Sequence, residues 1–417
     1  MILSNMRIRK LSLKKCIYFA LISALLLIFA FKIIVLKESP AKPWFFDNGE
    51  DYPLPTKGMG IKLLPFQDPE KDRIVNQLMY VPHNYEKINA SGQLKTILLV
   101  HGLLQWNVKR GRDVFLSDKC PVDSCELTND LDMAGTADMI LYKNYLITGN
   151  VSSTRLIRTN NTKQVWMLYN LECPYNTRKL KVPDVINWTA TYRRDSTIVA
   201  PYSKWVYYDD NVQQKQQHRN YAANKTKKVA WFVSNCIAVN GRLKYALELQ
   251  HHIQVDIYGA CGNLTCSRLT PEKCFKLLEN DYKFYLAFEN SNCIDYITEK
   301  YLVNALDRGV LPIVMGARPE DYEALAPRHS YIHVDSFESP KELAEYLKVL
   351  DADDVQYNSY FLWRGTGEFI DTHFWCRVCA MLHNEEELLK PYWYEDHNQW
   401  WRGPDVCSHR SWRNNSE

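Results

Sequence analysis

Acidic residues are missing from the first 37 positions of this 417-residue chain, whose first carboxylate is that of Glu38. After residue 36 there is no second apolar run long enough to return through a membrane, and there is no internal repeat, which excludes multispanning and solenoid architectures. A basic stripe interleaved with aromatic residues is also lacking beyond the N-terminus, and the formal net charge is only +3. Nucleic acid is therefore not an expected partner.

The N-terminus has the charge pattern of a membrane anchor. The twenty-one residues from Cys16 to Leu36 are almost all apolar, and a helix rising about 1.5 Å per residue would cross a bilayer over that length. A cleaved signal peptide is the alternative, but the run is long and no small-x-small cleavage site follows it. We expect a cytosolic tail at 1–15, a signal-anchor at 16–36 and a type II lumenal body, because the basic residues precede the run. These are Arg7, Arg9, Lys10, Lys14 and Lys15.

The rest of the chain carries two marks of a secretory lumen. Eleven of the twelve cysteines lie beyond the anchor, where an oxidising compartment favours disulfides. This odd number leaves one thiol over, and the sequence leaves open whether that thiol is buried, reactive or intermolecular. Seven Asn-x-Ser/Thr sequons are glycosylation candidates, at Asn89, Asn150, Asn160, Asn187, Asn224, Asn263 and Asn414.

Composition divides the body into a stem and two domains. Residues 37–72 are rich in proline and show no sustained period, which predicts a stem. The first domain, 73–228, ends in a polar linker at 211–228. Its predicted strands are 96–100, 138–142 and 165–168.

The second domain, 229–360, alternates strands and helices, which predicts βαβ units and a doubly wound parallel sheet. We expect the last segment, 361–417, to pack back on the body as a helix and a tryptophan-rich tail. The predicted strands are 229–233, 253–258, 283–288 and 310–315, and the predicted helices are 241–251, 338–350 and 362–389.

Residues 283–317 carry the strongest functional signal. A predicted strand ends at Phe288 and is followed by polar side chains, which is where ligands bind in such sheets. Asp295 is the expected N-cap of a helix whose first turns carry Glu299 and Lys300. A lysine there can neutralise a diphosphate, and a glutamate can accept hydrogen bonds from ribose hydroxyls. The segment therefore predicts a nucleotide-sugar site.

The same segment resembles the donor-site motif of the α1,3-fucosyltransferase family, glycosyltransferase family 10. The resemblance rests on FENS at 288–291, DYITEK at 295–300, the Asn304-Ala305 pair and a strand that ends at Gly316. It implies that GDP-fucose is the donor, with Lys300 on the diphosphate and Glu299 on the ribose. Tyr296 and Asn290 would shape the donor pocket.

A carboxylate to take the acceptor proton is expected at Glu172, which follows an apolar run in WMLYNLECPYN (166–176). A single glutamate before Cys-Pro is usually a loop residue. The segment is similar to the family's Asn-Leu-Glu-Ser-Pro, in which this glutamate is the general base. Cys173 stands where the family usually has serine.

Two further segments resemble the family's donor side. TATYRRDSTIVAPY (189–202) is similar to its TYRRDSD segment and implies donor-side roles for Tyr192 and Arg194. Adjacent strand residues point to opposite sides, so only one of the two arginines can face the donor, and the other would anchor Asp195 or a carbonyl. WFVSNCIAVNGRLKYALEL (231–249) resembles the family's strand-loop-helix segment, which implies that Arg242 binds the diphosphate and that Ser234 and Asn235 line the same loop.

A tightly bound metal is not predicted. Two Asp-x-Asp triplets occur, at 130–132 and 351–353, but neither matches the donor motif, and both are expected to be solvated loop or helix-end residues. Lys300 and Arg242 would supply the positive charge instead, and a divalent cation would at most stimulate. No cofactor is expected besides the donor substrate.

The Cys376-x-x-Cys379 pair allows a redox, zinc or structural interpretation, and a lumen favours structural disulfides. The family pairs its C-terminal CxxC with cysteines of the N-terminal domain. The resemblance therefore implies Cys120 and Cys125 as the partners.

Four stretches, 258–262, 329–337, 358–369 and 399–407, resemble the subgroup that fucosylates the innermost GlcNAc of N-glycans. The resemblance implies a type II Golgi enzyme of GT-B type, with two Rossmann-like domains facing a cleft and inverting transfer to the 3-hydroxyl of N-glycan GlcNAc. Antennal (Lewis-type) fucosylation, another nucleotide-sugar transfer and a non-catalytic glycan-binding membrane protein are the alternatives. Trp400 and Trp401 are expected either to stack against a sugar or to pack on the body.

Overall fold

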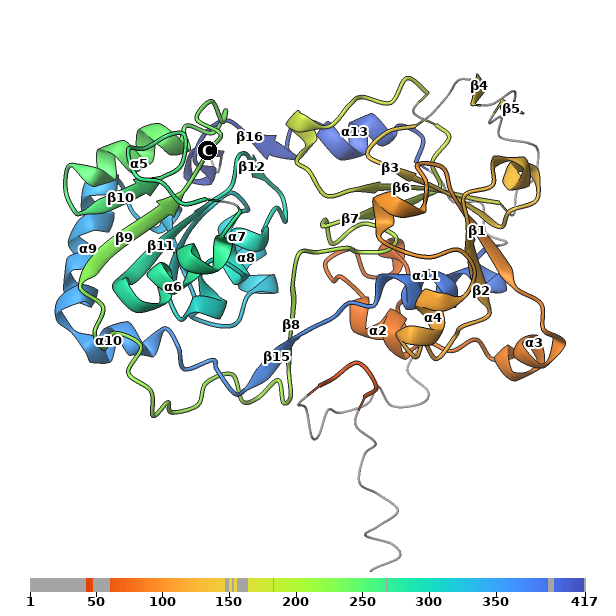
Figure 1. Cartoon of the computed structure of the whole chain (residues 1–417), viewed down its shortest axis with the longest axis horizontal. Coiled ribbons are helices and arrows are strands. Elements are labelled where there is room, and N and C mark those ends of the chain that lie inside the picture. The colour runs from red at the N-terminus through yellow and green to blue at the C-terminus, as the bar shows by residue number, and fades with distance from the viewer. Residues whose placement is uncertain are drawn as a thin grey trace, which may run out of the picture.

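The computed structural model describes residues 43–47, 61–146, 150–151, 154–155, 164–182, 184–267, 269–388 and 394–415. Two α/β lobes lie side by side, each built on its own five-stranded sheet (Figure 1). The predicted anchor at 16–36 and tail at 1–15 fall outside the described residues. Within the described ranges, no helix is long and apolar enough to cross a membrane.

The sheet of the first lobe has the order β2-β1-β3-β6-β7, and all its pairs are parallel. The three strands predicted here are confirmed to within two residues at each end. Ile97, Leu99, Met139 and Met167 are buried because apolar runs of this kind are covered on both faces of a parallel sheet. The strands are β1 (Lys95–Leu99), β2 (Cys125–Thr128), β3 (Met139–Lys143), β6 (Val165–Asn170) and β7 (Trp188–Thr191).

The sheet of the second lobe has the order β10-β9-β11-β13-β14 and is also parallel. The predicted doubly wound sheet is confirmed. Its strands are β9 (Lys227–Phe232), β10 (Val255–Tyr258), β11 (Tyr282–Phe288), β13 (Leu311–Met315) and β14 (Ile332–His333). Its helices are α5 (Arg242–Gln250), α6 (Pro271–Asp281), α7 (Glu299–Leu302), α8 (Pro319–Leu325), α9 (Pro340–Ala352) and α10 (Asp354–Ser359).

The central strand β11 is buried along its whole length and separates two cores. Phe284 and Leu286 pack with residues of α5 and α9 on one face, while Tyr285 and Ala287 pack with residues of α6, α7 and α8 on the other. Alternation of side chains along a strand produces this division. It leaves the carboxyl end of β11 as the place where polar side chains emerge.

The chain joins the lobes through a two-stranded antiparallel ribbon of β8 (Lys204–Tyr207) and β15 (Gly367–Ile370), visible between them in Figure 1. The helix predicted over 362–389 is therefore wrong in its first part. A Cβ at Gly367 would lie 2.2 Å from the Val206 carbonyl oxygen, so only glycine lets the two strands approach. The helix itself, α11, spans only Phe374–Leu382.

The C-terminal segment returns to both lobes. Disulfides join α11 to the first lobe as Cys120–Cys376 and Cys125–Cys379, which are the four cysteines that the resemblance brought together. Further along, β16 (Cys407–Ser408) pairs with β12 (Asn292–Cys293) of the second lobe, beside the disulfide Cys293–Cys407. The other helices are α2 (Ile74–Met79), α3 (Tyr85–Ser91), α4 (Asp113–Ser117), α12 (Glu385–Leu388) and α13 (His397–Arg402), and β4 (Asn150–Val151) pairs with β5 (Thr154–Arg155).

Some described residues within the predicted stem, 37–72, pack against the body. Phe45 and Phe46 are buried against Val206 and Ile370 of the connecting ribbon. Leu63 and Leu64 join the core of the first lobe. Burying such large apolar side chains stabilises the fold, so these parts of the segment belong to the body.

Short 3₁₀ turns are η1 (Pro65–Gln67), η2 (Leu103–Trp106), η3 (Leu131–Gly135), η4 (Pro174–Asn176), η5 (Leu306–Arg308), η6 (Val334–Ser336) and η7 (Trp412–Asn415).

Candidate active site

Glu172 lies two residues after β6, at the carboxyl edge of the first sheet, and four donors reach its Oε1 atom. Two come from its own loop, the backbone N–H of Cys173 at 2.8 Å and the Asn176 amide at 3.4 Å. The other two come from the second lobe, the Tyr296 hydroxyl at 2.9 Å and the Asn290 amide at 3.1 Å. The carboxylate is thus held by residues from both lobes.

These contacts set the charge state of Glu172. Burial alone would raise the pKa of its carboxyl, but hydrogen bonds from Asn290, Cys173, Tyr296 and Asn176 outweigh burial and hold that pKa below its usual value. The carboxylate is ionised at neutral pH. Among the described residues none donates to Oε2, so this oxygen is free to accept a proton from a ligand hydroxyl.

The residues behind Glu172 form a small aromatic core. Tyr192 is 1% exposed and packs against Tyr296 and Trp401, with ring centroids 4.9 and 5.5 Å away. Tyr192, a predicted donor-binding residue, therefore packs against Tyr296 and is not among the residues that line the donor cavity described next. Trp401 is 1% exposed. The Trp400 indole N–H donates to Asp195 at 2.9 Å, and the Arg193 guanidinium lies over the Trp400 ring. Both tryptophans pack on the body.

A cavity of about 500 Å³ opens at the carboxyl edge of the second sheet. Its size suits a nucleotide-sugar ligand. Six of the predicted donor-binding residues line it together: Ser234, Asn235, Arg242, Asn290, Glu299 and Lys300. Asn290 belongs to both places, since it lines this cavity and also donates to Glu172.

Lys300 is anchored by a residue that sequence reasoning did not single out. Its Nζ donates to the carboxylate of Glu289 at 2.8 Å, to the Thr298 hydroxyl at 2.7 Å and to Glu299 at 3.2 Å. Burial alone would lower the pKa of Lys300, but the two carboxylates reverse this and raise it above its ordinary value. Lys300 therefore stays charged beside the cavity.

Glu289 is 0% exposed, and its environment explains why Gly316 follows β13. A Cβ at Gly316 would lie 2.5 Å from Glu289 Cγ, so only glycine leaves room for this side chain. The signal was present in the sequence as an acidic residue directly after a strand that ends in the apolar run 284–288. The helix predicted from Asp295 is shorter than expected, because α7 begins at Glu299, after Thr298.

Arg242 begins α5 and lines the cavity, but its guanidinium also binds the protein. It donates to the Phe288 carbonyl at 2.8 Å and to the Asn235 carbonyl at 3.0 Å. Its Nε atom is buried and has no hydrogen-bond partner among the described residues. The loop that carries Ser234 and Asn235 is fastened by the disulfide Cys236–Cys261, and a fifth disulfide joins Cys266 to Cys274.

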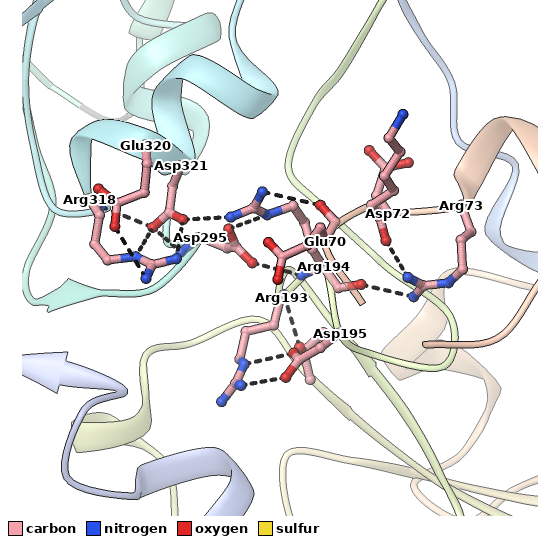
Figure 2. A network of polar contacts seen from close by, with 12 residues as sticks. Glu70, Asp72, Arg73, Arg193, Arg194, Asp195, Asp295, Arg318, Glu320 and Asp321 are labelled. Carbon is pink, nitrogen blue, oxygen red and sulfur yellow. Dashed lines mark hydrogen bonds and ion pairs between the residues drawn. The ribbon is translucent and has the colours of Figure 1, made fainter. Parts of the chain in front are cut away.

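Arg194, a predicted donor-binding residue, is not among the residues that line the donor cavity. Its side chain crosses to the second lobe and pairs with Asp295 at 2.8 Å and Asp321 at 2.7 Å (Figure 2). Arg193 anchors Asp195 at 2.6 Å, as predicted for the arginine that does not face the donor. The physical reason is that both carboxylates that pair with Arg194 belong to the second lobe, so the side chain is held at the boundary between the lobes.

Comparisons with known proteins give the family. A model of glycosyltransferase family 10 (fucosyltransferase), C-terminal part, matches residues 222–400, and a fucosyltransferase N-terminal model matches residues 93–203. A Drosophila melanogaster glycoprotein 3-alpha-L-fucosyltransferase A is 69% identical over 389 residues, which cover 91% of this chain and 76% of the relative. The chain belongs to glycosyltransferase family 10, the fucosyltransferases.

Other family members align less fully. The alpha-(1,3)-fucosyltransferase C of the same fly is 35% identical over 72% of this chain and 74% of the relative. A human 3-galactosyl-N-acetylglucosaminide 4-alpha-L-fucosyltransferase is 38% identical over 63% of this chain and 71% of the relative. A crystal structure of an alpha1,3-fucosyltransferase with GDP-fucose is 16% identical, with a TM-score of 0.46 over 73% of this chain and 93% of that one.

In this fucosyltransferase the two Asp-x-Asp triplets have structural contacts. The Asp130 carboxylate accepts from the backbone N–H of Asp132 at the start of η3. Asp351 pairs with Lys228 at 2.7 Å, and Asp353 caps α10. The described groups of side chains close enough to share a metal include cysteines that are already in disulfides.

The leftover cysteine and the sequons are also located. Cys173 is free and buried, with its Sγ 3.0 Å from the Ser291 hydroxyl. Asn187 is 8% exposed and its amide donates to the Gln164 carbonyl, so this sequon cannot accommodate a glycan in the folded protein, which corrects that prediction. Asn89, Asn224 and Asn263 are exposed, and the side chains of Asn150, Asn160 and Asn414 lie outside the described residues.

Proposed function

We propose that this fucosyltransferase moves L-fucose from GDP-fucose to the 3-hydroxyl of the innermost, Asn-linked GlcNAc of N-glycans, with inversion. The observation that carries the proposal is the position of Asn290, whose side chain lines the donor cavity and donates to Glu172 at 3.1 Å. The base and the donor site therefore share an edge. A donor in the cavity would have its reacting carbon near Glu172, as a single displacement requires.

Each group has a role in that displacement. Glu172 Oε2 takes the proton from the acceptor hydroxyl as the oxygen attacks the anomeric carbon of fucose. Lys300 and the free N–H groups of Arg242 stabilise the charge that develops on the departing diphosphate. Glu299, half-exposed beside Lys300, accepts from the ribose hydroxyls, and Ser234 and Asn235 complete the wall. Since protein cations meet the charge of the leaving group, a bound metal is not required.

Acceptor binding is proposed for the first lobe and the C-terminal tail. Tyr175 is 40% exposed and lies three residues after Glu172. Its ring stacks on His409 of the tail, with centroids 4.7 Å apart and planes 19° from parallel. Exposed aromatic faces bind sugar rings through their apolar side, so this pair would hold the acceptor glycan beside the base.

The core acceptor is favoured over antennal transfer by the extent of the similarity. The glycoprotein 3-alpha-L-fucosyltransferase aligns with 91% of the chain, whereas the human galactosyl-N-acetylglucosaminide enzyme aligns with 63%. Antennal, Lewis-type transfer remains the alternative. A non-catalytic glycan-binding membrane protein is disfavoured because Glu172, Arg242, Glu299 and Lys300 are all present and all but Glu172 line one cavity.

The proposed setting is a Golgi membrane. The protein would be a single-pass type II protein of GT-B type, with residues 16–36 as the anchor, the acceptor side at 73–228 and the GDP-fucose side at 229–360. The segment 361–417 would close the body. A lumenal location agrees with the five disulfides of the described residues.

The test incubates the protein without its first 42 residues with GDP-fucose and two acceptors, a trimmed N-glycopeptide and a LacNAc or LacdiNAc oligosaccharide. Transfer to the glycopeptide GlcNAc is expected. Transfer to the oligosaccharide alone would overturn the core assignment, and binding of GDP-fucose without transfer would favour the glycan-binding alternative. Tyr175→Ala should raise the acceptor KM while leaving the KM for GDP-fucose unchanged.

A further inference from the structure

A network of buried ion pairs links the two lobes (Figure 2). The backbone N–H of Arg194 donates to Asp295 Oδ2 at 2.8 Å, and its Nε donates to Oδ1 of the same carboxylate at 2.8 Å. Its Nη2 reaches Asp321 Oδ1 at 2.7 Å. The three side chains are 11%, 3% and 0% exposed, so the contacts are shielded from water and salt.

Each partner in the network is fixed from its own side. In the first lobe, Arg73 donates to the carbonyls of Arg194 at 2.8 Å and Ser196 at 2.7 Å. In the second lobe, Arg318 donates to Asp321 at 2.7 Å, and the Asp295 backbone N–H donates to Asp321 at 2.9 Å. Arg194 is thus the side chain that crosses between two rigid anchors.

Asp295 is the residue through which this network reaches the active site. It has a left-handed backbone with φ of 59°, a conformation that turns the chain sharply before Tyr296. The Tyr296 hydroxyl donates a hydrogen bond to Glu172 Oε1 at 2.9 Å, and the Tyr296 ring packs against the ring of Tyr192. Tyr192 itself lies two residues before Arg194. One segment therefore carries both Tyr192 and Arg194, and the other carries both Asp295 and Tyr296. The ion pair and the ring contact join the same two segments.

We propose that Arg194 is a positioning residue, which holds Asp295 and Asp321 across the lobe boundary and so fixes Tyr296 on the general base Glu172. The proposal rests on the proposed function, because it gives Glu172 that role. Arg194 touches neither the donor cavity nor Glu172, so it acts through Tyr296. Its loss should change the base and leave donor binding intact.

The acid limb of the pH–rate profile reports this contact directly. The titratable groups that face Glu172 are Cys173 on its own loop, Tyr192 and Tyr202 of the first lobe, and Tyr296 of the second. All four have pKa values raised by burial, so they stay neutral through the acid range. Asp295, the carboxylate that Arg194 holds, also titrates near this range, because burial and the neighbouring Asp321 raise its pKa to about 7. Only a shift of the acid limb that Arg194→Gln and Tyr296→Phe share therefore reports Glu172. The Tyr296 hydrogen bond lowers the pKa of Glu172, and its loss must raise that pKa.

The experiment measures kcat, both KM values and the acid limb for Arg194→Gln, Tyr296→Phe and the double variant. Each single variant should lower kcat about tenfold, move the acid limb upward by up to about one pH unit and leave the KM for GDP-fucose unchanged. The double variant should match Tyr296→Phe alone, because both changes remove one contact. Additive losses in the double variant would overturn the proposal.

Arg318→Gln is the matched control. It removes an ion pair to the same Asp321 carboxylate from within the second lobe but leaves the contact of Arg194 with Asp295, so it should lower Tm while kcat and the acid limb change much less than in Arg194→Gln. If Arg194→Gln behaves like this control, the proposal is wrong.

Should Arg194→Gln fail to fold, Arg194→Lys keeps one charged contact and should give a smaller shift of the same limb, whereas an unshifted limb would overturn the proposal. If the wild type is active but the Arg194 variants show no shift of the acid limb, the positioning role is wrong and the proposed function still stands.

Discussion

The two lobes have sheets of the same strand order, yet their functional edges are chemically different. At the carboxyl edge of the second sheet, the cations Arg242 and Lys300 are mostly buried, and Lys300 pairs with Glu289, whose pKa burial raises. At the same edge of the first sheet, Glu172 receives four donors and every one is neutral. The difference matches two tasks, because a leaving diphosphate needs positive charge whereas a base loses strength when a cation pairs with it.

The largest effect is expected from Glu172→Gln, which keeps the four donors occupied but removes the proton acceptor. We expect kcat to fall by about 10³, within the range for loss of a general base, while the affinity for GDP stays unchanged. Single-turnover kinetics and calorimetry with GDP measure the two quantities. Full activity in this variant would show that the neutral edge is not the site of proton transfer.

A charge removed from the second lobe should affect both catalysis and stability. Lys300→Met is expected to lower kcat/KM for GDP-fucose about 10²-fold, and to lower the free energy of unfolding by about 3–5 kcal/mol because Glu289 is left buried and unpaired. The double variant Lys300→Met with Glu289→Gln should regain most of the stability but none of the activity. Recovery of activity in the double variant would show that Lys300 has only a structural role.

The pH dependence should reflect the neutral edge. The pKa of Glu172 is held below its ordinary value, so the carboxylate stays ionised as the pH falls from 7 to 5. We expect kcat to stay flat over that range and to decline only when the pH falls through the lowered pKa. An acid limb centred near pH 6, with the protein still folded by circular dichroism, would contradict the hydrogen-bond pattern.

The smallest effect should come from salt. The donor site uses partly exposed charges, and screening of such charges increases as the Debye length falls from about 10 Å at 0.1 M to about 3 Å at 1 M. The KM for GDP-fucose should therefore rise with ionic strength, and the KM for a neutral glycopeptide should not. The acceptor titration is the internal control, and an equal rise in both would remove the contrast between the two edges.

Much of this architecture could be predicted from local sequence. Apolar runs predicted the strands, the helix after β11 predicted positions for Glu299 and Lys300, and the family resemblance singled out Glu172. What could not be predicted depends on partners far along the chain. Gly367 lies in a strand whose partner, Val206, is in another part of the chain. Asn187 matches the sequon pattern, although folding buries its side chain beside Gln164. Local pattern also could not assign Arg194, since its two carboxylates are more than 100 positions away.

The sequence by itself determined the family, the order of the elements and the residue types that donor chemistry needs, because strand periodicity and motif spacing are local properties. Only the tertiary structure decided which of these residues meet. Glu172 is joined to Asn290 and Tyr296 across 118 and 124 positions, and those contacts fix its charge state. A pKa depends on the groups within a few ångströms, and in this protein half of those groups come from the other lobe.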